Sequence, residues 1–230
     1  MERMLITGAS RGIGRALAVR LAKPGRELLL HGRDAAALEE SARLVRAADG
    51  VARTFIADLG DAAQVEALAA AVGGEALTAL VHNAGVATVK PIAELSLEEW
   101  QTSLAVNVTA PFLLSRLLAP RMASGAAIVH VLSVAARRGF PSWAAYCAGK
   151  FALEGFAQCL REELRPKGVR VINVYPSATA TELWDGVAGS WPRERMLPPE
   201  QVAEAVAFAL ERPAEVLVPE IFIGHQAGEL

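Results

Sequence analysis

A tyrosine and a lysine four residues apart, Tyr146 and Lys150, are the side chains in this sequence best suited to proton transfer. Residues i and i+4 lie one above the other on a helix face, so the ammonium can stand beside the phenol. At about 4 Å and an effective dielectric near 20 their attraction reaches roughly 4 kcal/mol, which predicts a lowered pKa for Tyr146. Ser133, thirteen residues upstream, ends an apolar run and adds a hydroxyl. An exposed helical pair is the plain alternative.

A glycine-rich turn, TGASRGIG at residues 7–14, follows the first apolar run. Gly8 can adopt backbone angles closed to other residues, and Gly12 and Gly14 let a phosphate and the sheet approach the chain closely. The helix that begins here offers free N–H groups and a partial positive charge to a pyrophosphate. The turn predicts a dinucleotide cradle, and its spacing excludes a P-loop. An ordinary glycine-rich connection is the alternative.

Two arginines indicate which dinucleotide would bind: Arg11 lies in the turn and Arg33 follows the second apolar run. NAD-binding proteins usually carry an acid at the end of that strand for the ribose 2′-hydroxyl. Two guanidinium groups could instead clamp a 2′-phosphate, which favours NADP(H). Solvated surface charge is the alternative for both arginines. Asp34 is either a displaced ribose acid or the N-cap of the next helix, and we favour the cap.

Further polar residues stand where later apolar runs stop. Asp58 could bond the adenine amino group, and Asn83 could contact a cofactor or tie neighbouring strands together. Asn107 lies four residues before Pro111, whose missing N–H frees the Asn107 carbonyl to bind a water. The four histidines and two cysteines have no metal-ligand spacing, so no metal site is predicted.

Seven short apolar runs, interleaved with stretches of helical periodicity, would position these groups. Asp34, Asp61 and Ser96 each precede a helical stretch as N-caps, and Ser96 with Glu99 forms a capping box. The alternation predicts a single doubly wound α/β domain over residues 1–230, with a Rossmann-type, mostly parallel sheet of about seven strands. Such sheets bind ligands at the carboxyl ends of their strands. The predicted strands are Met4–Thr7, Glu27–Leu30, Ala52–Ala57, Leu77–Val81, Ala127–Leu132, Val169–Val174 and Val216–Ile223.

The composition limits the kinds of partner that the protein is expected to bind. With 53% hydrophobic residues, 21% charged residues and a net charge of −2, the chain is not disordered and has no broad electrostatic pull toward nucleic acid or an anionic membrane. Two isolated cysteines fit a reducing cytosol. No basic segment precedes the first apolar run, so we expect no signal peptide and a cytoplasmic location. The uncharged stretch Trp100–Ser115 contains Asn107 and Pro111 and does not resemble a membrane span.

Together these motifs resemble the short-chain dehydrogenase/reductase family in order and spacing. The resemblance implies hydride transfer between a nicotinamide and a carbonyl or secondary alcohol. It implies that Tyr146 exchanges the proton, Ser133 bonds the substrate oxygen, Lys150 binds the nicotinamide ribose and Asn107 holds a relay water. The motifs are Thr7–Gly14, Asp58, Asn83–Gly85, Asn107, Ser133, Tyr146 with Lys150, and Pro176–Thr181. The implied cofactor-binding set is Gly8, Ser10, Arg11, Gly12, Ile13, Gly14, Arg33, Asp58, Leu59, Asn83, Ala84, Gly85, Tyr146, Lys150, Pro176, Thr179 and Thr181.

The sequence departs from the family pattern at two places. His82 replaces an asparagine before Asn83, and Ser177 and Thr179 replace a glycine and an aliphatic residue after Pro176. The altered turn after Pro176 bears on the fine placement of the nicotinamide. Members with basic residues at the positions of Arg11 and Arg33 prefer NADP, which agrees with the physical argument.

The segment 181–196 matches the family's substrate lid. There Trp184 and Trp191 either line an apolar pocket or pack against the domain. Because relatives pair two of their helices, we expect a homodimer or homotetramer. A cofactor-sensing binding protein without turnover is one alternative function. A 3-oxoacyl-carrier-protein reductase with Arg137 and Arg138 facing the acidic carrier is another.

Overall fold

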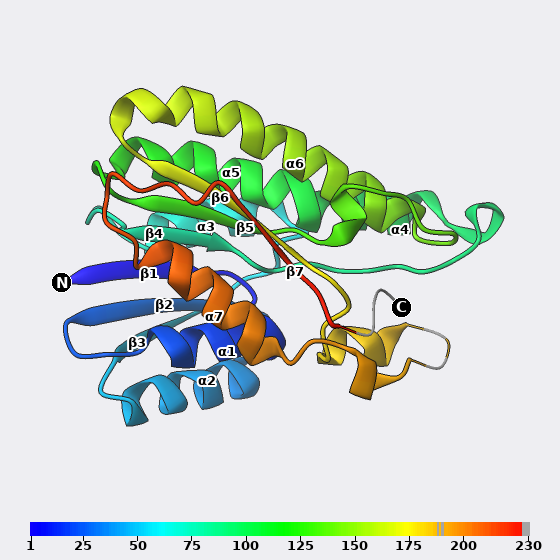
Figure 1. The fold of residues 1–230 in the computed structure, drawn as a ribbon, viewed down its shortest axis with the longest axis horizontal. Coiled ribbons are helices and arrows are strands. Elements are labelled where there is room, and N and C mark those ends of the chain that lie inside the picture. The colour runs from blue at the N-terminus through cyan, green and yellow to red at the C-terminus, as the bar shows by residue number, and fades with distance from the viewer. Residues whose placement is uncertain (188, 190, 227–230) are drawn as a thin grey trace.

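A seven-stranded, wholly parallel sheet forms the centre of the computed structural model, which describes residues 1–187, 189 and 191–226 (Figure 1). The strands lie in the order β3-β2-β1-β4-β5-β6-β7, so the winding reverses between β1 and β4, where such sheets bind ligands. The predicted doubly wound Rossmann-type fold is confirmed. The extent of the domain stays a prediction, and residues 227–230 lie outside the described ones. The strands are β1 Glu2–Ile6, β2 Arg26–Gly32, β3 Val51–Ile56, β4 Ala79–His82, β5 Ala127–Val131, β6 Arg170–Pro176 and β7 Glu220–Ile223.

Helices cover both faces of the sheet (Figure 1). Side chains such as Leu30 and Val206 form the core under one layer, and Leu29 and Leu114 form the core under the other. Because both faces are buried, the central strands are continuous apolar runs rather than alternating ones. One layer contains α1 Gly12–Leu21, α2 Ala35–Ala47 and α7 Pro199–Leu210, and the other contains α3 Ala62–Ala71, α4 Leu97–Leu104, α5 Ala110–Leu118 and α6 Ala144–Leu164.

The predicted helix starts are confirmed. The Asp34 carboxylate accepts from the Ala37 N–H at 3.0 Å, Asp61 caps α3, and Ser96 with Glu99 forms the capping box of α4. The strand predicted from Val216 begins only at Glu220, because Pro219 has no N–H for the ladder. β4 begins at Ala79, two residues later than predicted, and includes His82.

A π-helical turn, Ala105–Thr109, joins α4 to α5 in the stretch where Pro111 is predicted to free the Asn107 carbonyl. The Ala110 N–H donates to the Ala105 carbonyl, and Pro111 lies in the first turn of α5, where its missing N–H is tolerated. By length and hydropathy the whole stretch Leu97–Arg121 could cross a bilayer, but 56% of its most apolar window is buried inside the protein. Here it serves as a core helix.

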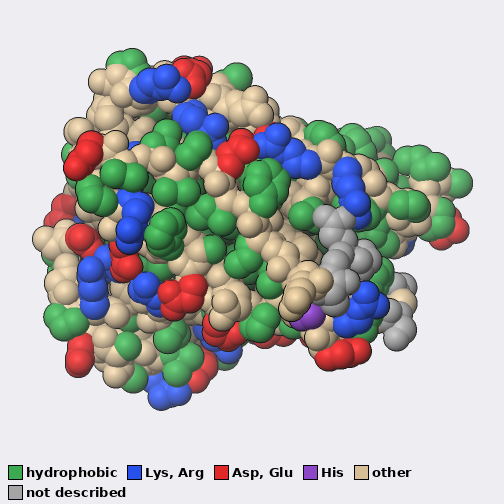
Figure 2. All heavy atoms as spheres, in the orientation of Figure 1, with side chains coloured by type: hydrophobic (Ala, Val, Ile, Leu, Met, Phe, Trp, Pro, Cys, Tyr) green, Lys and Arg blue, Asp and Glu red, His purple; other side chains and the backbone are tan. Residues whose placement is uncertain are grey.

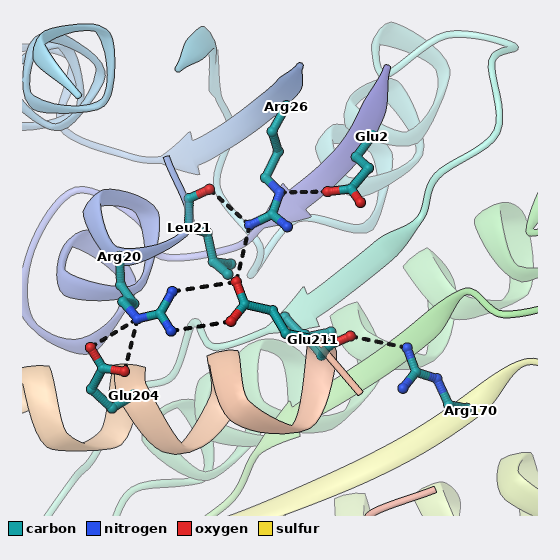
Figure 3. A network of polar contacts seen from close by, with 8 residues as sticks. Glu2, Arg20, Leu21, Arg26, Arg170, Glu204 and Glu211 are labelled. Carbon is teal, nitrogen blue, oxygen red and sulfur yellow. Dashed lines mark hydrogen bonds and ion pairs between the residues drawn. The ribbon is translucent and has the colours of Figure 1, made fainter. Parts of the chain in front are cut away.

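The amino ends of the strands are tied by arginines (Figure 3). Arg26, at the start of β2, pairs with Glu2 at 2.7 Å and donates to the Leu21 carbonyl at 2.9 Å. Arg20 of α1 donates to both oxygens of Glu204 of α7 at 2.8 Å and also pairs with Glu211. These contacts fix α1 against α7 at the edge of the sheet opposite the polar strand ends.

Candidate active site

A cavity of about 770 Å³ opens at the carboxyl ends of the strands. It runs from the glycine turn after β1, past the ends of β4 and β5, to the segment after β6. Of the predicted site residues, all except Gly14 and Asn107 line it. The lining predicted residues are Gly8, Ser10, Arg11, Gly12, Ile13, Arg33, Asp58, Leu59, Asn83, Ala84, Gly85, Ser133, Tyr146, Lys150, Pro176, Thr179 and Thr181.

Neighbouring atoms lie so close to Gly8, Gly12 and Gly14 that these positions have no room for a side chain. Gly8 and Gly12 have φ of +67° and +53°, the left-handed region that favours glycine. A Cβ on Gly8 would lie 2.8 Å from the Ala84 Cα, and one on Gly12 would lie 2.9 Å from the Thr181 Cγ2. A Cβ on Gly14 would lie 2.2 Å from the Gly8 carbonyl oxygen, so Gly14 packs helix against turn rather than facing the cavity.

Asn83 joins the two strands at the switch point. Its Nδ2 donates to the carbonyls of Thr7 and Gly8 at 2.9 and 3.1 Å. The Thr7 hydroxyl accepts from the N–H groups of Asn83 and Ala84 at 3.0 and 3.1 Å. The sequence leaves open whether Asn83 contacts a cofactor or ties neighbouring strands together. The structure shows that it ties the strands, and Asn83 also lines the cavity.

Arginines line the end of the cavity beside β2. Arg11 and Arg33 are exposed there, and neither guanidinium group has a hydrogen bond or ion pair within the described part of the chain. Asp34 caps α2, as favoured above. A third guanidinium was missed by the sequence analysis: Arg15 donates to the Ser41 hydroxyl and the Ala37 carbonyl at 3.0 Å each. Its position, one residue after Gly14 in the first turn of α1, was the available signal.

Ser133, Tyr146 and Lys150 come together at the centre of the cavity. Ser133 follows β5, and its hydroxyl accepts from the Ala135 N–H at 3.1 Å. Lys150 is buried, donates to the Val131 carbonyl at 2.9 Å, and holds its Nζ 5.5 Å from the centroid of the Tyr146 ring. The helix α6 therefore presents phenol and ammonium on one face beside the end of β5, as their spacing predicts.

The pKa of Tyr146 shifts opposite to the prediction. Burial raises it to about 12, because the phenolate would lie in an apolar environment, and hydrogen bonding with Ser133 only partly opposes the rise. Burial also lowers the pKa of Lys150 to about 8. The predicted lowering is wrong because burial of the phenol dominates, and the Lys150 ammonium, which bonds the Val131 carbonyl, does not offset it.

Asn107 stands just behind the cavity wall. Its Oδ1 accepts from the Val86 N–H at 3.1 Å, and its Nδ2 donates to the Val86 carbonyl at 2.9 Å. The Nδ2 also donates to the Ser103 hydroxyl at 3.1 Å. The empty side of Gly85 faces both Asn107 and Lys150: a Cβ there would lie 3.0 Å from Asn107 Oδ1 and 3.8 Å from Lys150 Nζ. The π-turn thus brings Asn107 close to the ammonium, and its relay water stays a prediction.

Tryptophans line the far end, beyond Tyr146. Trp184 and Trp191 both contact the ring of Trp143, the residue before α6, which the sequence analysis missed. Of the predicted lid, residues 188 and 190 lie outside the described residues. At the altered turn, the Thr179 hydroxyl donates to the Ser177 carbonyl at 3.0 Å, so its polar group is satisfied locally.

Two other residues singled out by the sequence lie away from the cavity. His82 stacks on His130 with ring centroids 5.1 Å apart, and burial lowers the pKa of both imidazoles, so this pair packs in the core as neutral rings. Arg137 pairs with Glu154 at 2.7 Å and with Glu220 at 2.8 Å. Its charge is thus engaged within the chain, which disfavours a docking role toward a carrier protein.

Comparison with known proteins agrees with this geometry. The family described as short chain dehydrogenase matches residues 2–189. The chain is 36% identical over 226 residues to D-threitol dehydrogenase of Mycolicibacterium smegmatis, covering 93% of this chain and 87% of that protein. It is 32% identical to sepiapterin reductase of Chlorobaculum tepidum, covering 99% and 97%.

A solved structure has the same fold. The alcohol dehydrogenase of the archaeon Thermococcus sibiricus, complexed with 5-hydroxy-NADP, superposes with a TM-score of 0.90 at 29% identity, covering 100% of this chain and 99% of that one. The family match and this superposition both include the chain from the glycine turn to the segment after β6. The chain belongs to the short-chain dehydrogenase/reductase family of oxidoreductases.

Proposed function

We propose that this protein interconverts a carbonyl compound and a secondary alcohol with NADP(H), using Tyr146 as proton donor and acceptor. One observation carries the proposal: Ser133, Tyr146 and Lys150 share a single cavity with the glycine turn and with Arg11 and Arg33. A group that can exchange a proton and a turn that can hold a dinucleotide therefore line the same cavity. NADPH, when bound, supplies the hydride to the carbonyl carbon and leaves as NADP⁺.

The residues present fit that cofactor. The left-handed Gly8 and Gly12 leave the turn and the start of α1 open to a pyrophosphate. Asp58 and Leu59 line the cavity and would hold the adenine, and the cations of Arg11 and Arg33 suit a 2′-phosphate. The NADP analogue named for the Thermococcus structure supports the same choice. Pro176, Thr179 and Thr181 would hold the nicotinamide end.

In reduction, Tyr146 gives its proton to the substrate oxygen while the Ser133 hydroxyl bonds that oxygen. The raised pKa of Tyr146 keeps this donor protonated at neutral pH. Lys150 would bind the nicotinamide ribose and, with the water proposed at Asn107, return a proton to the phenol. Oxidation of the alcohol runs the same proton exchange in reverse.

The substrate is proposed to be a small molecule and the location cytoplasmic. On the face shown in Figure 2, Lys and Arg side chains alternate with Asp and Glu, so that face has no field of one sign to attract nucleic acid or a membrane. The segment 181–196 is proposed as the substrate lid. The carrier-protein alternative is weakened by the engaged Arg137.

A panel of carbonyl compounds tests the function against the sensor alternative. Purified protein with NADPH and a small reactive diketone, 2,3-butanedione, should oxidise NADPH at a rate proportional to enzyme, followed at 340 nm. A sensor would bind NADPH, as seen by a change in its fluorescence, without any carbonyl-dependent oxidation. Protein that binds NADPH yet reduces no member of the panel would contradict the proposed function.

We also propose that α5 and α6 pair with a second copy of the chain. They lie side by side (Figure 1) and leave Phe112 and Phe151 about half exposed, at 42% and 46%. The double variant Phe112→Ser, Phe151→Ser should shift the protein to monomer in light scattering, because two exposed aromatic anchors are lost. Val51→Ser, at 46% exposure on the sheet edge, is the matched control. A wild-type monomer at micromolar concentration would contradict the pairing.

A further inference from the structure

We propose that the substrate end of the cavity selects neutral carbonyl compounds that carry an aromatic ring, such as aryl ketones. This inference rests on the proposed function and names the substrate class of the same site. It is carried by an aromatic cluster, defined here as Trp143, Trp184 and Trp191, that adjoins the ring of Tyr146.

The cluster is continuous and reaches the reacting group. The Trp143 ring meets the Tyr146 ring at a centroid distance of 5.5 Å and an interplanar angle of 68°, an edge-to-face contact. Trp184 and Trp191 lie 5.7 and 6.3 Å from Trp143, also edge-to-face, and 4.7 Å from each other. All three indoles line the cavity and Trp143 contacts the Tyr146 ring, so the cluster forms a wall on which the substituent of a carbonyl at Tyr146 can pack.

The rings are held by the chain itself. The Trp184 Nε1 donates to the Thr179 carbonyl at 2.8 Å, and the Trp191 Nε1 donates to the Val187 carbonyl at 3.3 Å. Trp143 is the N-cap residue of α6, and its carbonyl accepts from the Cys147 N–H at 2.8 Å. With two of the three indole N–H groups already bonded, the cluster offers a substrate mainly apolar ring faces and edges.

Charge is concentrated at the other end of the cavity. Arg11, Arg15 and Arg33 lie beside β2, and Lys150 bonds the Val131 carbonyl. Glu182, although next but one to Trp184 in sequence, reaches back to the glycine turn, where its Oε2 lies 3.5 Å from the Cβ position of Gly12. Asp185 pairs with Arg193 at 2.7 Å. Among the described residues that line this end of the cavity, the aromatic cluster therefore has neither a ready partner for a carboxylate or phosphate nor a row of polar groups for a polyol.

The aromatic cluster discriminates between substrates by the polarity of the group that packs against it. A substrate hydroxyl or anion placed against the indoles loses its water and gains no hydrogen bond, which costs free energy. An aromatic ring there gains edge-to-face contacts beyond the burial of its area, a preference of about two- to tenfold over a saturated ring of equal size. The same wall therefore favours aryl ketones and disfavours polyol ketones and keto acids.

The test compares three ketones in the NADPH assay: acetophenone, cyclohexyl methyl ketone of the same size, and the polyol ketone erythrulose. In wild type, kcat/KM should be about two- to tenfold higher for acetophenone than for cyclohexyl methyl ketone, and lowest for erythrulose. Trp191→Leu should erase the aromatic preference mainly through KM, and Trp191→Phe should keep most of it. Trp100→Leu, the fourth tryptophan and not part of the lining, should leave the preference unchanged.

Each outcome decides one claim. Erythrulose turned over as well as acetophenone, or an aromatic preference untouched in a folded Trp191→Leu, would overturn this inference while the proposed function stands. Absence of turnover with every carbonyl, 2,3-butanedione included, would count against the proposed function. In that case ligand-observed NMR with two unreactive amides still decides the inference: benzamide should bind wild type more tightly than cyclohexanecarboxamide, and equal binding would overturn it.

Discussion

Tyr146→Phe should lower kcat/KM for carbonyl reduction by about a hundred- to ten-thousandfold, the usual contribution of a positioned proton donor. The change removes one hydroxyl and keeps the ring that packs on Trp143, so the cavity keeps its shape. The Kd for NADPH should stay within about threefold of wild type, since Lys150 and the glycine turn are intact. Steady-state assays and a fluorescence titration of NADPH measure the two quantities.

Tyr175→Phe is the matched control, since Tyr175 is the other tyrosine of the chain. Its ring is fully buried, and its hydroxyl accepts from Arg137 at 2.8 Å, away from the cavity. Losing that hydroxyl should cost about 1 kcal/mol of the free energy of unfolding and leave kcat/KM near wild type. A Tyr146→Phe protein with near-wild-type turnover would remove Tyr146 from the proposed chemistry.

The raised pKa of Tyr146 gives the same prediction a pH dependence. With a pKa of about 12 the phenol stays protonated across neutral pH, so reduction should not lose its proton donor there. Oxidation needs the phenolate, so its rate should rise as the pH is raised. Initial rates in both directions against pH check the sign.

Arg33→Ala should weaken NADPH binding about tenfold or more and change NADH binding little. Hydrogen bonds to charged groups contribute about 1.5–3 kcal/mol each, and only NADPH carries the 2′-phosphate. Arg33 lines the cavity and has no ion pair among the described residues, so its charge is available to a ligand. Raised salt should weaken NADPH binding more than NADH binding, because the added attraction is ionic.

The matched control is Arg43→Ala on the outer face of α2. Arg43 is an exposed guanidinium paired with Glu40 at 2.7 Å and does not line the cavity. It should leave both affinities unchanged. Equal wild-type affinities for the two reduced cofactors, or tighter NADH, would show that Arg33 is a surface charge and that Asp34 holds a ribose despite capping α2.

The fold could be predicted because its signals are local. Helix caps such as Asp34 and Ser96 act within one turn, and apolar runs report burial on both sheet faces. The site followed from one topological rule, that parallel strands gather their carboxyl ends at one edge. That rule accounts for Gly8, Asn83 and Ser133 on one cavity wall although they are far apart in sequence, whereas Tyr146 reaches the cavity from α6.

The features of the site that the sequence did not predict are those that depend on tertiary packing. The rise in the Tyr146 pKa comes from burial, which a pair spacing does not report. Trp143 becomes part of the site only because the segment after β6 folds back over the start of α6 and brings Trp184 against it. Gly14 looks like a phosphate contact in the motif, yet the approach of the Gly8 carbonyl makes it a packing residue.

Deuterium transfer tests the central claim most directly. The protein is incubated with NADPH deuterated at the C4 position of its nicotinamide and with 2,3-butanedione, and the alcohol is analysed by mass spectrometry and NMR. We predict one deuterium on the newly formed carbinol carbon in wild type, when both C4 hydrogens of NADPH are replaced by deuterium, and its near loss in Tyr146→Phe. An alcohol without deuterium, or bound NADPH left unoxidised across the carbonyl panel, would contradict the assignment of this cavity to hydride transfer.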